Sequence, residues 1–114
     1  MSKQLYLRYV ESLIRAALKE ARVVSLYGPR QAGKTTLVRQ FAGKRVPYYT
    51  LDDDATLGAV SMDPVGFVRS LDFAEIDEVQ REPRLVRAIK RSVDKDSRPG
   101  RFLLASSANL MKLP

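Results

Sequence analysis

Residues 28–35 read GPRQAGKT and fit the phosphate-binding pattern G-x-x-x-x-G-K-[ST]. Gly28 and Gly33 carry no Cβ, so the backbone there can turn tightly and come close to an anion. The N–H groups of such a loop point at phosphate oxygens, at the N-terminal end of the following helix. Lys34 would reach the β- and γ-phosphates of ATP, and the Thr35 hydroxyl would bind Mg²⁺. The residues expected to surround the nucleotide are Gly28, Pro29, Arg30, Gln31, Ala32, Gly33, Lys34, Thr35 and Thr36.

The residues on either side of this loop predict a strand before it and a helix after it. Residues 23–27 (VVSLY) are typical of a strand, and residues 35–41 (TTLVRQF) continue from the loop as a helix. Further upstream, apolar residues recur with the spacing of one helical face, at Val10, Leu13, Ile14, Ala17 and Leu18. We expect this face to pack against the sheet or a neighbouring module.

Three more strands and three more helices follow along the chain. The strands are expected at 48–51, 71–76 and 101–105, and the helices from near Ala55, from Pro64 to about 70 and from Pro83 to about 94. Tyr48 and Tyr49 are expected to serve packing. Strands that alternate with helices predict an α/β fold with a mostly parallel sheet and helices on both faces.

Two acids, Asp77 and Glu78, come directly after the strand expected at 71–76. In a parallel sheet this strand end lies on the same edge as the phosphate loop. We expect Asp77 to hold Mg²⁺ through water, and Glu78 to polarise the water that attacks the γ-phosphate. A second acidic group, residues 52–54, either caps the next helix or joins the site at this edge.

The composition indicates a globular protein and excludes several kinds of functional site. With 114 residues, 45% hydrophobic and 29% charged, the chain has the size and balance of one globular domain. It has no cysteine, which excludes disulfides and thiolate metal sites, and no histidine, so acid–base chemistry falls to carboxylates, Lys or Tyr. No apolar run matches a membrane span or a signal peptide. We expect a cytoplasmic protein that does not contact a membrane.

The net charge of +7 allows two interpretations. Lys and Arg can simply keep a small domain soluble, or they can contact nucleic acid. The helix expected from Pro83 carries basic residues on its outer side, at Arg84, Arg87, Lys90 and Arg91. One alternative to an ATPase is therefore a non-enzymatic module that binds nucleic acid and carries an inert phosphate loop. A small-molecule kinase is a third reading, which the placement of Glu78 for water activation disfavours.

Four segments carry a family resemblance: GPRQAGKTTL, LDDDATLGAV with the later DP and GF, IDEVQ with its following proline, and RFLLASS. Together they resemble an AAA-like P-loop ATPase family of prokaryotes, in order and at the expected spacing, from about Leu13 onward. Full-length members of that family carry a C-terminal domain of unknown function. The resemblance implies a three-layer αβα P-loop NTPase fold, a Walker A role for residues 28–35, and Walker B roles for Asp77 and Glu78. It also implies that Gln80 or Ser107 senses the γ-phosphate.

The sequence departs from the family pattern at two places. Glu75 stands where aliphatic residues are expected, in a strand that should be buried on both faces. A buried, unpaired carboxylate either destabilises the fold or stays protonated. The fourth expected strand ends in residues 104–107 (LASS), whereas the corresponding family segment ends Leu-Thr-Gly-Ser.

The resemblance also implies a sheet order of first, fourth, third and second strand, with a fifth strand outside the first. We expect residues 1–114 to form a single AAA-like P-loop ATPase domain that lacks this fifth strand and the C-terminal domain. The phosphate-loop strand would then be an edge with unpaired backbone groups. The expected behaviour is weak to moderate nucleotide binding, hydrolysis near background, and self-association through that edge.

Overall fold

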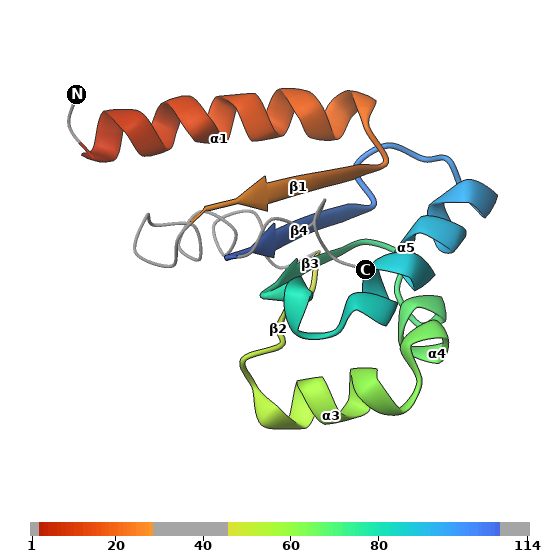
Figure 1. Cartoon of the computed structure of the whole chain (residues 1–114). Helices are drawn as coiled ribbons and strands as arrows, with labels where there is room; N and C mark the ends of the chain where they lie inside the picture. The colour runs from red at the N-terminus through yellow and green to blue at the C-terminus, as the bar shows by residue number, and fades with distance from the viewer. Residues whose placement is uncertain (1–2, 29–45, 108–114) are drawn as a thin grey trace.

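The computed structural model describes residues 3–28 and 46–107. The expected phosphate loop beyond Gly28, the helix expected after it and the last seven residues lie outside these ranges. Thus the positions expected to bind nucleotide at Pro29, Arg30, Gln31, Ala32, Gly33, Lys34, Thr35 and Thr36 are not among the described residues. Figure 1 shows the elements in order: α1 (Lys3–Glu20), β1 (Val23–Tyr27), β2 (Tyr48–Thr50), α3 (Asp54–Met62), α4 (Pro64–Arg69), β3 (Ala74–Asp77), the 3₁₀ helix η2 (Val79–Arg81), α5 (Pro83–Lys95) and β4 (Phe102–Ser106).

The four strands form one parallel sheet in the order β1-β4-β3-β2. This is the order that the family resemblance implied, and it confirms the α/β fold class. In the register, Leu104 lies between Ser25 of β1 and Ile76 of β3, and Ile76 pairs with Tyr49 of β2. Because all strands run the same way, their carboxyl ends meet at a single edge of the sheet.

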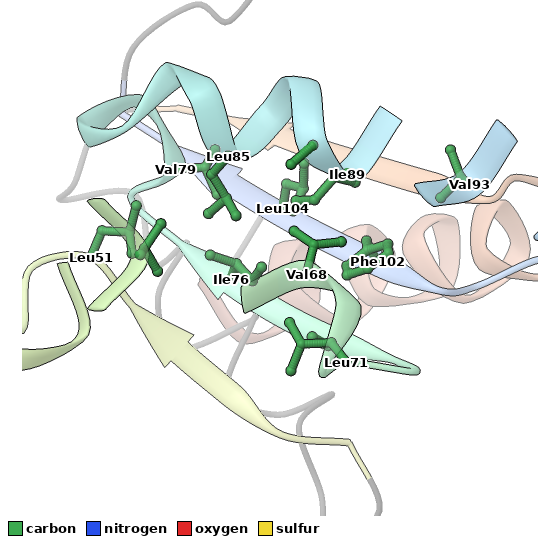
Figure 2. Close-up of a cluster of buried hydrophobic side chains, with 13 residues drawn as sticks. Leu51, Val68, Leu71, Ile76, Val79, Leu85, Ile89, Val93, Phe102 and Leu104 are labelled. Atoms are coloured by element: carbon green, nitrogen blue, oxygen red, sulfur yellow. The ribbon is translucent and has the colours of Figure 1, made fainter. Parts of the chain in front are cut away.

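The main core lies between the sheet and the helices α4 and α5. Alternate residues of β3 and β4 face these helices and are buried, including Ile76, Phe102 and Leu104. Helix α5 presents its apolar side to them, with Leu85, Ile89 and Val93 all buried. Figure 2 shows this cluster, in which Val68 of α4 lies beside Phe102. The alternation of β strands and helices thus produces the layers that the sequence predicts.

Helix α1 lies beside β1, on the side of the sheet away from α4 and α5 (Figure 1, Figure 2). Of its expected apolar stripe, Ile14 is buried but Leu13 is 52% exposed. The stripe is narrower than predicted because α1 packs along an outer strand of the described sheet. Gly100, with φ of 75°, brings the turn before β4 against the end of α1: a Cβ there would lie 2.9 Å from the Leu18 carbonyl oxygen.

The acids at 52–54 serve the ends of helices and the surface. Asp53 caps α3 by accepting from the Thr56 backbone N–H at 3.0 Å. Asp52 instead forms an ion pair with Arg81 at 3.1 Å. In the same way Asp63 caps α4 through the Gly66 N–H at 3.0 Å. The capping interpretation is therefore confirmed for Asp53.

Several strand boundaries differ from the prediction, and the largest shifts are at the starts of β3 and β4. The strand expected at 71–76 begins at Ala74 and includes Asp77, and the strand expected from Arg101 begins at Phe102. The cause is the Arg101 side chain, which is only 4% exposed. Its guanidinium donates to the carbonyl oxygens of Asp72 at 3.0 Å and Leu71 at 3.3 Å, so these residues turn towards the arginine and do not extend β3. No helix among the described residues is long and apolar enough to cross a membrane.

Candidate active site

Three strands bring their ends to the same edge of the sheet. Gly28 follows β1, Asp77 ends β3, and Ser106 ends β4. The Gly28 N–H donates to the Ser106 carbonyl oxygen at 3.2 Å, so the first residue of the phosphate-loop sequence is tied to the end of β4. The sheet therefore places the start of that sequence on the same edge as the predicted acidic pair, as the topology required.

Hydrogen bonds from Tyr48 and Glu78, both among the described residues, hold Asp77 in place. Its side chain is buried, at 1% exposure. One carboxylate oxygen, Oδ2, accepts from the Tyr48 hydroxyl at 3.0 Å, and the other, Oδ1, accepts from the Glu78 backbone N–H at 2.9 Å. Tyr48, which was expected to serve packing, also donates its hydroxyl to this acid. Tyr49 does pack, edge to face on Phe67 with ring centroids 5.2 Å apart.

Glu78 turns sharply out of β3. Its backbone has φ 57° and ψ 42°, the left-handed conformation that only a few per cent of non-glycine residues adopt. The side chain is buried, at 2% exposure, and its Oε2 accepts from the Gln80 amide at 2.7 Å and from the Ser107 hydroxyl at 2.9 Å. A residue held in a rare backbone conformation by several contacts is typical of functional sites.

Gln80 and Ser107, which the family resemblance implied as alternative sensors of the γ-phosphate, belong to one hydrogen-bond network. The Ser106 hydroxyl donates to Gln80 Oε1 at 3.0 Å, which orients the amide so that its Nε2 faces Glu78. That same Nε2 also donates to the Ser107 hydroxyl at 3.0 Å. Both polar side chains thus meet at the Glu78 carboxylate, and the network joins η2 to the end of β4.

Glu75 is buried in β3 as the sequence analysis anticipated. It is 4% exposed, and among the described residues its Oε2 has no hydrogen-bond partner. Burial raises the pKa of this carboxyl from 4.5 to about 8. The side chain is therefore largely protonated at neutral pH.

Comparison with known proteins identifies the family of this chain. A family model described as an AAA domain matches residues 20–114. The chain belongs to this AAA domain family. Family membership supports a nucleotide-binding, ATPase-type function and confirms the resemblance noted in the sequence.

Two mycobacterial proteins are similar to this AAA domain. They are the uncharacterized proteins Rv2008c of Mycobacterium tuberculosis and Mb2031c of Mycobacterium bovis, each 43% identical over 98 residues. The matches cover 84% of this chain and 22% of each relative, so the chain spans about a fifth of their length. Among solved structures, PCH-2 of C. elegans is similar with a TM-score of 0.48 and 19% identity, over 94% of this chain and 36% of that one.

Proposed function

We propose that this AAA domain binds MgATP at the carboxyl edge of its sheet and hydrolyses the γ-phosphate. The observation that carries the proposal is that two acids and the first residue of the phosphate-loop sequence lie at one edge of the sheet. Asp77 and Glu78 are buried at the end of β3, and Gly28 follows the end of β1, with β4 between these two strands. Separate parts of the sequence thus supply phosphate-binding and acidic residues to one edge.

The residues at this edge fit Mg²⁺ as an ion shared with a nucleotide. Mg²⁺ in ATPase sites is usually held by one or two protein oxygens, waters and the phosphates themselves, without a dedicated cage of side chains. Asp77 offers one carboxylate, oriented by Tyr48 and the Glu78 N–H, and Thr35 would add a hydroxyl. When bound, Mg²⁺ would neutralise charge on the β- and γ-phosphates. Lys34 would bind the same phosphates from the loop.

Glu78 is proposed to orient the attacking water and to take its proton. Gln80 and Ser107 are positioning residues, because both donate to Glu78 Oε2 and fix the direction of the carboxylate. The chain has no histidine that could take this role. We propose that Gln80 or Ser107 senses the γ-phosphate through this network, because both contact the Glu78 carboxylate.

The test is to separate binding from hydrolysis with three variants. We expect MgATP to raise the melting temperature of the chain and Lys34→Ala to abolish that rise. Asp77→Asn should weaken the dependence on Mg²⁺. Measured in a chain that also carries the fifth strand expected from the family resemblance, Glu78→Gln should keep binding and lower the rate by about 10²-fold or more, the usual contribution of a general base. A folded chain whose melting temperature does not respond to millimolar MgATP would contradict the proposal, as would an unchanged rate in Glu78→Gln.

A nucleic-acid-binding module is the second candidate, favoured by the exposure of the basic side of α5. Arg87, Lys90 and Arg91 are exposed there. Arg84, however, is tied to the Glu82 carboxylate at 2.5 Å and to the Ser61 carbonyl oxygen at 2.8 Å, which leaves a smaller basic face than the sequence suggests. Salt-dependent binding of duplex DNA that survives Lys34→Ala and is lost with Arg87→Gln and Lys90→Gln would support this second function.

A further inference from the structure

A cavity of about 470 Å³ lies between α4 and α5, away from the candidate active site. Its lining includes Leu71, just before β3, and Arg101, just before β4, so it opens at the amino edge of the sheet. Asp77 and Ser106 mark the carboxyl edge at the other ends of these strands. A five-residue strand such as β4 spans roughly 16 Å, which separates the two places. The cavity is therefore distinct from the nucleotide site proposed above.

Two acids in the lining are already neutralised by arginines. Asp96 pairs with Arg98 at 2.6 Å and lies 3.8 Å from Arg101 Nε. The hydrogen bond from Arg98 lowers the pKa of Asp96 to about 2, so this carboxylate stays ionised in its pair. Arg98 also pairs with Asp72, the second acid of the lining.

Three cations of the lining have no such partner. Arg69, Arg91 and Lys95 are exposed, and none of them makes an ion pair or a side-chain hydrogen bond within residues 3–28 and 46–107. Arg101 adds a fourth positive charge beneath them. It is 4% exposed, and its guanidinium donates mainly to backbone carbonyl oxygens and to the Ser92 hydroxyl at 2.9 Å. The cavity thus holds an excess of positive charge that the described residues do not balance.

The placement of these cations fits a compact anion better than an extended one. Arg91 and Lys95 are one turn apart on α5, hence on the same side of the helix, and Arg69 comes from the last turn of α4. Side chains from two packed helices therefore converge on one hollow. One Arg guanidinium can donate two parallel hydrogen bonds to two oxygens of the same phosphate, a geometry that few other side chains match.

We propose that this cavity binds a small organic phosphate, with the phosphate group on Arg69, Arg91 and Lys95. The rest of the ligand would lie against the apolar wall that Val65 and Val68 contribute. Binding sites for small molecules usually measure about 300–1,000 Å³, so the volume suits such a ligand and exceeds what a lone phosphate ion would fill. The site is independent of ATP binding at the other edge.

The experiment uses phenyl phosphate as the probe and the 114-residue chain carrying Lys34→Ala, so that the phosphate loop contributes no binding. We expect saturable binding by calorimetry at 150 mM NaCl, with backbone amide shifts at residues 69, 91 and 95. Arg91→Gln with Lys95→Gln should weaken the affinity at least tenfold. The matched control is Arg87→Gln with Lys90→Gln, which removes the same charge from α5 outside the cavity and should leave the affinity unchanged.

Several outcomes would overturn the proposal. Absence of saturable binding at 10 mM phenyl phosphate is the first. The second is an equal loss of affinity in both double variants, which would show a diffuse response to net charge. Phenol and inorganic phosphate complete the test: the proposal requires that each bind more weakly than phenyl phosphate. Tight binding of a DNA duplex that phenyl phosphate cannot displace would also count against a small-ligand site.

Discussion

Tyr48 and Glu75 are direct neighbours on adjacent parallel strands, yet the Tyr48 hydroxyl donates to Asp77, two residues further along β3. The tyrosine thus stabilises the acid at the strand end and leaves Glu75 without that donor. The Asp77 carboxyl accepts hydrogen bonds at both oxygens in the candidate site, whereas the Glu75 carboxyl is buried with Oε2 unsatisfied among the described residues. The contrast leads to the first two predictions.

We expect stability to fall as pH rises from 5 to 8. The pKa of Glu75 is about 8 in the folded chain and 4.5 as its ordinary value, so the folded state binds more protons between these values. The free energy of unfolding then decreases with pH, at a slope approaching about 1.4 kcal/mol per pH unit. The chain has no histidine to obscure this window. Urea unfolding at several pH values measures the slope. Glu75→Leu should flatten it and raise stability at pH 8, whereas Glu20→Gln at an exposed position should do neither.

Replacing Tyr48 by phenylalanine tests the bond to Asp77. The variant keeps the ring and loses the donor, so we expect a loss of about 1 kcal/mol in the free energy of unfolding. If Asp77 holds Mg²⁺, nucleotide binding should also need more Mg²⁺ than in the wild type. Tyr9→Phe, at a 59% exposed position on α1, is the control and should change neither quantity. An unchanged stability in Tyr48→Phe would show that the hydroxyl is equally well solvated without Asp77.

Gln80 and Ser107 should act as a unit on hydrolysis. Each donates to Glu78 Oε2, and Gln80 also donates to Ser107, so removing either one loosens the same carboxylate. We expect Gln80→Ala and Ser107→Ala each to lower kcat about tenfold with little change in nucleotide affinity, and the double variant to lose much less than the product of the two. Ser97→Ala is the control. Fully additive losses would mean that the two residues act separately.

Substitution of Arg101 should lower the free energy of unfolding more than substitution at most other positions. Its guanidinium satisfies the carbonyl oxygens of Leu71 and Asp72, in the connection between α4 and β3, and that of Ser92 on α5. Arg101→Met would leave these acceptors buried, and we expect a loss of about 3 kcal/mol or more. Arg101→Lys should rescue only part of it, because one ammonium group cannot reach all three. Arg87→Met, on the exposed side of α5, should stay within about 0.5 kcal/mol of the wild type.

The outer side of β1 should promote association. Within the described residues, β1 pairs with β4 alone, and its outer backbone groups have no strand beside them. We propose that a strand found in longer family members covers this edge. Sedimentation of the 114-residue chain should then show association that rises with concentration and that Ser25→Lys weakens, since a charge at the centre of an edge strand disfavours pairing. Ser97→Lys should have no effect. A strictly monomeric chain at high concentration would contradict the proposal.

The helix ends were predictable because their signals are local. Asp53 and Asp63 each cap a helix within three residues of their own position, and the sequence shows this directly. The hydrogen-bond partners of Asp77 and Glu78 were harder to predict from the sequence. Tyr48 reaches Asp77 through the register of two strands 29 residues apart, and nothing in the local sequence sets that register. The start of β3 at Ala74 was also not predicted, because it depends on a contact between distant parts of the sequence. The Arg101 guanidinium binds the carbonyl oxygens of Leu71 and Asp72, so these two residues do not extend the strand.

Because the backbone at Glu78 is left-handed, selection for folding and selection for nucleotide turnover should favour different residues at this position. That conformation costs an ordinary residue roughly 1–2 kcal/mol, whereas glycine adopts it freely. A library of variants at position 78 that is selected for folding alone should therefore enrich glycine and asparagine. A library selected for nucleotide turnover should keep glutamate, because only its carboxylate joins Gln80 and Ser107 at the end of β3. The position thus marks where the sequence accepts a less stable backbone in exchange for a placed carboxylate.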